Sequence, residues 1–286
     1  MISKTLFCLL ESLTNDEQSR LADYINSPFF NKDENVGRLY SFLQKKMKQK
    51  RMQNFDKKAV AKYVFPKLQA ATAERKVTSL FKKIEQLILD FLVVLKREEH
   101  PKEDVTLLLN ILNDRHIEAV WTKIWQKYGV KGNKVVNSNI DDFRYHYSLA
   151  KNWHEFAISD SKLKLETNLQ DILIRFETYY VAQMLLYMCA ALNSVRKSNE
   201  SIDLPMLPAV LEIVEKRKLD ETEPLIRCYK AIVLLLQTQK QQYFDELLLV
   251  LGNDVLQLEK AELSGIYTIA INYCIRRYNQ GNVVFG

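Results

Sequence analysis

The stretch that decides the fold is Val77-Thr-Ser-Leu-Phe-Lys-Lys-Ile-Glu-Gln-Leu-Ile-Leu-Asp-Phe-Leu-Val-Val-Leu95. Within it, apolar side chains return every three or four residues, the spacing that places them on one face of an α-helix. The pattern lasts about five turns and predicts a long helix that ends before His100-Pro101, because proline disfavours helical geometry in the preceding residue. The apolar positions are Val77, Leu80, Phe81, Ile84, Leu87, Ile88, Phe91 and Val94 or Leu95.

The rest of the chain repeats this helical pattern and contains few residues that would break it. Only 7 glycines and 6 prolines occur in 286 residues, whereas average usage would make them about 12% of a chain. No segment alternates apolar and polar residues as a half-buried strand would. Helix starts are predicted at two capping boxes, Thr14 with Glu17 and Asn31 with Glu34, and at Asp56. The sequence therefore predicts an all-α fold.

The predicted helices fall into two groups. Residues 1–100 are interpreted as an N-terminal basic helical module, and residues 101–286 as an array of helical hairpins. A polar stretch at 131–139 is the strongest candidate for an internal boundary. In the second group we expect helices over 105–112, 117–128 with Gly129 as its cap, 140–158, 163–195 with one break, 207–218, 224–238, 242–251 and 256–278.

Three of the later helices share a faint motif, in which a tyrosine precedes small and then large apolar residues. Its tyrosines are Tyr180, Tyr229 and Tyr267, and their spacing is close to the ~34–47 residues of known two-helix repeats. Such repeats bury their apolar sides only against their neighbours. The motif favours a right-handed α-solenoid-like array of helical hairpins. The alternative is a compact helical bundle in which buried tyrosines recur by chance.

The most specific element near the N-terminus is Ser27-Pro28-Phe29-Phe30-Asn31. With the helix around 179–180, the segment around 228–229 and the run 272–281, it resembles a group of uncharacterised all-helical, tetratricopeptide-like proteins of Bacteroidota. The resemblance implies a scaffold with no assigned reaction, so it transfers no functional residues. It also implies that a chain stopping at 283–286 is C-terminally incomplete, with an uncapped last hairpin.

The sequence contains no motif for catalysis or metal binding. None of the four histidines, at positions 100, 116, 146 and 154, forms a pair with ligand spacing, and Asp142 with His146 is interpreted as an ordinary surface contact. All glycines are isolated, which excludes a Gly-rich phosphate loop, and no Gly-x-Ser-x-Gly element occurs. We therefore expect a protein that is not an enzyme and that uses no cofactor.

Cysteine usage and hydropathy bear on the compartment. Cys8, Cys189, Cys228 and Cys274 lie far apart in apolar contexts, which favours small buried hydrophobic side chains in a reducing compartment. The most apolar stretch, 87–95, contains Asp90 and is much shorter than the ~20 residues of a membrane span. The sequence thus predicts a cytoplasmic protein without a membrane segment.

Charge is the one uneven property of the chain. Residues 1–100 carry 19 basic and 12 acidic side chains, and within residues 40–83 the ratio is 13 to 2. Such a segment fits phosphate backbones or acidic protein surfaces, although a solvated basic face on two or three helices is the favoured explanation. The candidate binding patch is Lys45, Lys46, Lys48, Lys50, Arg51, Lys57 and Lys58.

Aromatic residues near this patch could stack on bases, but their positions favour core packing. The interleaved rings are Tyr40, Phe42, Phe55, Tyr63, Phe65 and Phe81. Core packing is likewise the preferred role for Trp121, Trp125 and Trp153, although tryptophan also anchors interfaces. From these observations we predict a non-catalytic helical scaffold that binds an unknown protein partner. The alternative is nucleic-acid binding through residues 40–83.

Overall fold

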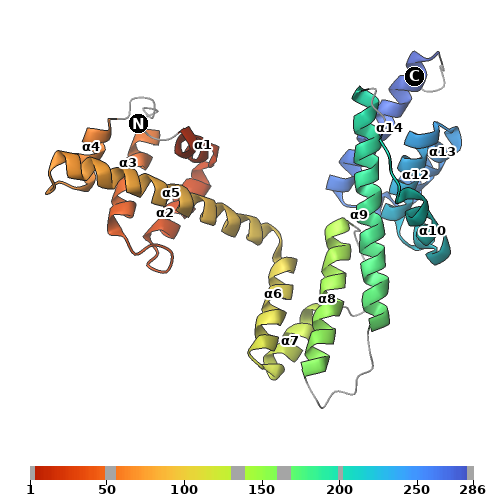
Figure 1. The fold of residues 1–286 in the computed structure, drawn as a ribbon, viewed down its shortest axis with the longest axis horizontal. Helices are drawn as coiled ribbons and strands as arrows, with labels where there is room; N and C mark the ends of the chain where they lie inside the picture. Colours follow the sequence, from red (N-terminus) through yellow and green to blue (C-terminus); the bar gives the residue numbers. More distant parts are fainter. Residues whose placement is uncertain (1–3, 49–55, 130–138, 160–168, 199–201, 282–286) are drawn as a thin grey trace. The chain divides into compact units, whose positions relative to one another are not determined.

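The computed structural model describes residues 4–48, 56–129, 139–159, 169–198 and 202–281. These residues are almost entirely helical and contain no strand (Figure 1), so the predicted all-α fold is confirmed. The chain divides into two compact units, Met1–Pro101 and Lys102–Gly286, called here the N-terminal and C-terminal units.

The N-terminal unit is built around one long helix. The quoted stretch lies within α5, and its residues Ile84 and Ile88 are fully buried against the helices that precede it. The predicted long helix is therefore confirmed, with His100 as its C-terminal cap residue. The helices of this unit are α1 (Lys4–Ser12), α2 (Asn15–Asn26), α3 (Glu34–Lys48), α4 (Lys57–Val64) and α5 (Ala70–Glu99).

The helix starts agree with the sequence at two of three places. Thr14 and Glu17 form the predicted capping box of α2, the Thr14 amide donating to Glu17 Oε2 at 2.7 Å. Asp56 accepts from the Lys58 amide at the start of α4, as predicted. The predicted box of Asn31 with Glu34 is wrong. Asp33 takes the capping role instead and accepts from the Asn35 amide at 3.1 Å.

The C-terminal unit packs its helices mainly along the two long neighbours α9 and α12. Helix α8 lies beside α9, α9 packs on α12, and α12 packs on α13. From Leu169 on, α9 runs without the break predicted between 163 and 195, and residues 163–168 lie outside the described residues. Of the expected boundary stretch 131–139, only Asn139 lies within the described residues. The helices of this unit are α6 (Pro101–Asp114), α7 (Glu118–Tyr128), α8 (Ile140–Ser159), α9 (Leu169–Ser198), α10 (Leu207–Arg217), α11 (Leu219–Thr222), α12 (Pro224–Thr238), α13 (Gln241–Asn253), a short 3₁₀ turn (Val255–Gln257) and α14 (Lys260–Asn279).

The three tyrosines of the sequence motif do not occupy equivalent places. Tyr229 is buried in α12, where its hydroxyl donates to Glu262, whereas Tyr267 is 42% exposed. In α14 the buried ring is Tyr273, six residues further along the chain. The motif therefore marks the apolar faces of helices but does not by itself establish a repeat.

A separate aromatic cluster holds α7 against α8. Trp121 is completely buried and stacks on Phe156 at a centroid distance of 3.7 Å and on Trp125 at 5.3 Å. Trp153 closes the cluster at 5.8 Å from Trp121. The predicted core role is confirmed for Trp121, while the other two indoles are half-buried at its rim.

The cysteines divide into buried and accessible ones. Cys189 and Cys228 are buried in the α9–α12 core, as predicted, and Cys274 is half-buried. The prediction is wrong for Cys8, which is exposed. The core face of α1 carries Leu6 and Leu10, and the helical period of 3.6 residues turns Cys8 to the opposite side.

Glu223, at the start of α12, should make the C-terminal unit pH-sensitive. Burial raises the pKa of its carboxyl group to about 7, so the folded state holds a proton that the unfolded chain releases near pH 4.5. The contribution of Glu223 to the stability of the folded unit is therefore highest below the pKa of the unfolded chain, and it is lost as pH rises through the pKa of the folded state. We expect Glu223→Gln to raise the melting temperature at about pH 8 and to leave it unchanged at about pH 4. An equal shift at both pH values in a calorimetric comparison would contradict this origin.

Candidate interaction surface

The loop Ser27–Asn31 between α2 and α3 is held by hydrogen bonds at both of its ends. The amides of Phe30 and Asn31 donate to the Ser27 carbonyl at 3.1 and 2.9 Å. The Asn31 side-chain amide donates to the Ile25 carbonyl at 2.9 Å and the Asp33 carbonyl at 3.1 Å, and its oxygen accepts from the Asp33 amide. The loop is thus tied to the end of α2 and to the start of α3.

Asp33 fastens the same segment to α5. One carboxylate oxygen accepts from the backbone and side chain of Asn35, and the other forms an ion pair with Lys83 at 2.7 Å. These contacts hold the pKa of Asp33 below its usual value, chiefly through the Lys83 hydrogen bond. The carboxylate therefore remains charged and keeps both attachments over the neutral pH range.

A line of aromatic rings leads from the core of the N-terminal unit to the tip of this loop. Phe91 of α5 is buried, Tyr24 lies 5.5 Å from it, and Phe30 stacks on Tyr24 at 4.0 Å. Phe29 meets Phe30 edge-on at 4.9 Å and is 84% exposed. A fixed loop thus presents an apolar ring to solvent, a position that the hydrophobic effect alone disfavours.

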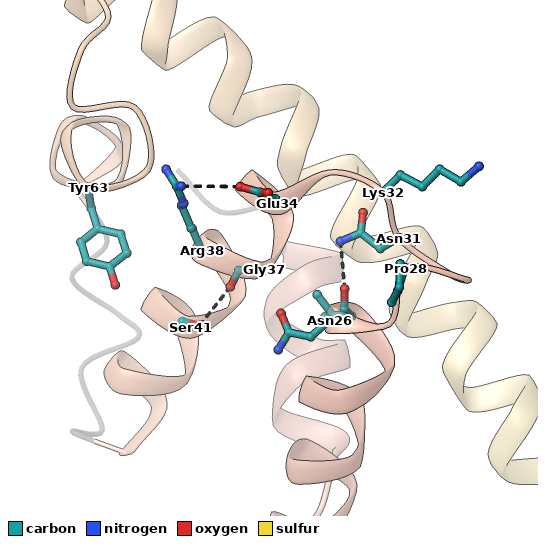
Figure 2. A pocket seen from close by; sticks show the side chains of 10 residues that line it. Asn26, Pro28, Asn31, Lys32, Glu34, Gly37, Arg38, Ser41 and Tyr63 are labelled. Atoms are coloured by element: carbon teal, nitrogen blue, oxygen red, sulfur yellow. Dashed lines mark hydrogen bonds and ion pairs between the residues drawn. The ribbon is translucent and has the colours of Figure 1, made fainter.

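Two grooves flank the loop. The larger, here called the Asn26–Tyr63 groove, has a volume of about 560 Å³ and lies between the loop, α3 and α4. Figure 2 shows Tyr63 on one side of it and Pro28 and Asn31 on the other, with the ion-paired Arg38 and Glu34 between them. The smaller groove, of about 390 Å³, opens towards α5 beside Phe30 and Lys83.

Gly37 lies in the lining of the larger groove, opposite the side chain of Asn26. A Cβ atom at this position would lie 2.7 Å from Asn26 Oδ1, the end of a flexible side chain that could turn aside to make room.

The basic candidates predicted from the sequence lie on α3 and α4 where the structure describes them. Lys45 and Lys58 are exposed, and Lys46 and Lys57 are half-exposed. The side chain of Lys48 and the whole of Lys50 and Arg51 lie outside the described residues. Further along the segment, α4 adds Lys62 and α5 adds Arg75, Lys76, Lys82 and Lys83, all exposed.

Several of these cations lie over aromatic rings. Lys45 Nζ is 5.8 Å from the ring centre of Tyr63, and Lys46 Nζ is 5.6 Å from that of Phe42. The two rings are neighbours, at 5.2 Å between centroids. The predicted core role is confirmed for Tyr40 and Phe81, which are buried, but it is wrong for Tyr63, which is 44% exposed. Tyr63 follows the buried Ala61 by two positions, about 200° around the short helix α4, which places its ring on the outer side.

The comparisons with known proteins give no relative. The chain matches no protein-family model, no curated protein and no solved structure. Its possible functions therefore follow from its own surfaces.

The described part of the chain gives no candidate metal centre. Among the described residues, no three His, Cys, Asp or Glu side chains gather to hold a metal ion. Asp142 and His146 were predicted to form a surface contact on α8. The Asp142 carboxylate is instead buried, and it pairs with Lys102 of α6. Burial and the nearby Arg175 lower the pKa of His146.

None of the helices that the structure describes is long and apolar enough to cross a membrane.

The C-terminal unit also exposes apolar side chains, along the outer face of α14. Tyr267, Ile271, Ile275 and Tyr278 recur at helical spacing and are 42–56% exposed. The inner face of the same helix carries the buried Ile266, Ala270 and Tyr273. An apolar stripe on both sides of one helix is typical of a helix that packs between two layers.

Sequence reasoning did not identify the most exposed aromatic residue. Phe29 lies between Pro28 and Phe30 in a turn, where adjacent side chains point in different directions. Two consecutive phenylalanines after a proline are therefore a signal that one ring stays outside the core. The two grooves had no such signal, because they depend on how α2, α3 and α4 approach one another.

Proposed function

We propose that the protein is a non-catalytic helical scaffold that binds another protein, with the Ser27–Asn31 loop as a contact point. The observation that carries this proposal is Phe29, which is 84% exposed on a loop fixed by hydrogen bonds. Exposed aromatic residues on rigid supports lose little conformational entropy on binding and commonly dominate interfaces. The grooves on either side of the loop provide room for partner side chains.

The same proposal extends to the architecture of the C-terminal unit. We regard α8–α9 and α12–α13 as hairpins stacked through α9 and α12, in the manner of tetratricopeptide-like proteins. The contacts between these helices and the outward apolar stripe of α14 support such layering. In this arrangement the stripe is the face on which a further layer or a partner packs.

A photochemical experiment tests the contact point. Phe29 is replaced by p-benzoyl-phenylalanine, an aromatic residue that forms a covalent adduct with whatever lies against it under ultraviolet light. The matched control carries the same residue at Tyr187, which is 64% exposed in the C-terminal unit. We expect a discrete adduct from position 29 and none from position 187. No adduct, or the same diffuse set from both positions, would contradict the proposal.

Removing the Phe29 ring should weaken partner binding while leaving the stability of the fold nearly unchanged. Because Phe29 is exposed, Phe29→Ala should change the free energy of unfolding by no more than about 0.5 kcal/mol. Loss of an anchoring aromatic residue typically costs about 2 kcal/mol or more of binding, roughly 30-fold in affinity. Calorimetric titration of the captured partner against the two proteins measures this difference. Equal affinities would place the interface elsewhere.

A further inference from the structure

The α3–α4 surface combines cations with aromatic rings in an arrangement that its own contacts do not neutralise. We define it as Phe42, Lys45 and Lys46 of α3 with Lys57, Lys58, Lys62 and Tyr63 of α4. Lys45 and Lys46 lie over the rings of Tyr63 and Phe42, and those rings contact each other at 5.2 Å. Lysines and rings thus alternate across a single helix–helix seam.

Acidic side chains do not balance this charge. Among the described residues, the lysines of the α3–α4 surface have no ion-pair partner, whereas Lys83, farther along the basic segment, is paired with Asp33. The nearest acidic residue in sequence, Asp56, uses a carboxylate oxygen to cap the Lys58 amide. Clustered like charges repel one another, and a bound polyanion would relieve that repulsion. The surface is therefore suited to a ligand that carries several negative charges.

The rings determine what kind of polyanion fits. Tyr63 is 44% exposed and forms one wall of the Asn26–Tyr63 groove, whose volume of about 560 Å³ can accommodate a nucleobase. Beyond it, Lys32 adds a further cation to the lining of the groove, whereas Arg38 is paired with Glu34. Proteins that bind single strands combine a cationic track with aromatic rings on which bases stack. A duplex keeps its base faces covered, and an acidic polypeptide has no planar base to stack.

We propose that the α3–α4 surface binds single-stranded nucleic acid, with Tyr63 stacking on a base and the surrounding lysines contacting phosphates. This activity goes beyond the protein-binding role proposed above: it shares the Asn26–Tyr63 groove with that role but does not involve Phe29. Contacts with about five phosphates would make affinity for a single strand fall about 100-fold between 50 and 200 mM salt.

Fluorescence anisotropy with the full-length protein tests this proposal. The probes are a labelled 15-nucleotide oligo(dT), a duplex of equal length and a labelled 15-residue poly-glutamate. We expect the single strand to bind most tightly and to show the steepest salt dependence. Tighter binding of poly-glutamate would identify an acidic protein as the ligand and overturn the proposal. So would equal binding of the duplex, or no binding of oligo(dT) at 50 mM salt.

Variants locate the site and separate stacking from charge. Tyr63→Leu removes the planar ring and should weaken oligo(dT) binding about 5- to 150-fold, while Tyr63→Phe retains it. Lys45→Gln and Lys62→Gln should each reduce the salt slope by about 0.7. The matched controls in the C-terminal unit are Tyr187→Leu and Lys260→Gln, which should change neither quantity. Unaltered binding by Tyr63→Leu, or equal losses in the controls, would overturn the assignment. Circular dichroism confirms that each variant is folded.

Discussion

Trp121→Ala should lower the free energy of unfolding of the C-terminal unit by about 3–5 kcal/mol. The indole is completely buried, and three other aromatic rings lie within 3.7–5.8 Å of its centroid. Alanine would leave a cavity between α7 and α8, because rings that stack in fixed planes cannot close over a missing indole. Denaturant unfolding, followed by circular dichroism and by the fluorescence of Trp125 and Trp153, measures this loss.

A second substitution separates cavity formation from polar loss at the same position. The Trp121 Nε1 hydrogen is buried, and it has no hydrogen-bond partner among the described residues. Trp121→Phe therefore sacrifices no hydrogen bond and should cost clearly less than Trp121→Ala. If the alanine variant lost less than about 1 kcal/mol, the cluster would not be the packing centre of α7 and α8.

Ile84→Ala should destabilise the N-terminal unit by about 2–5 kcal/mol without affecting the tryptophan signal. Ile84 is fully buried in the middle of α5, where the helix packs on the rest of its unit. All three tryptophans of the protein lie in the C-terminal unit, so their fluorescence reports only on that unit. Circular dichroism should therefore show an early transition that fluorescence does not follow.

The matched control for Ile84 lies on the same helix. Leu89 is 45% exposed, and Leu89→Ala should change stability by no more than about 0.5 kcal/mol. If Ile84→Ala shifted the circular dichroism and fluorescence midpoints together, the two units would unfold as one cooperative body. That result would contradict the separate unfolding of Met1–Pro101 and Lys102–Gly286 that we expect from their division into two compact units.

The features predicted correctly from sequence are those determined by neighbouring residues. The apolar period of α5 needs only its own 3.6-residue repeat, and the Thr14–Glu17 box joins residues three apart. Asn31 shows where this reasoning fails. Its spacing to Glu34 fits a capping box, but its side chain instead reaches back to the Ile25 carbonyl, an interaction set by the path of the loop.

The candidate surfaces were predictable only in part, for the same reason. A count of charges in residues 40–83 locates the basic segment. The count does not show that Tyr63 lies outside the core, because its position depends on which side of the short helix packs against α3 and α5. The assignment of Tyr63 to the core was wrong for this reason, and the neighbouring groove depends on how α2, α3 and α4 pack together.

The positions of the cysteines allow the distance between the two units to be followed by fluorescence. Cys8 is the one cysteine of the N-terminal unit and is exposed, whereas Cys189 and Cys228 are buried, and burial raises the pKa of both thiols, that of Cys228 to about 12. With Cys274 replaced by serine, a maleimide dye would react at Cys8 alone. Such a dye can accept excitation from the tryptophans, which all belong to the other unit. Energy transfer would then follow the separation of the two units in solution, with and without a partner or an oligonucleotide.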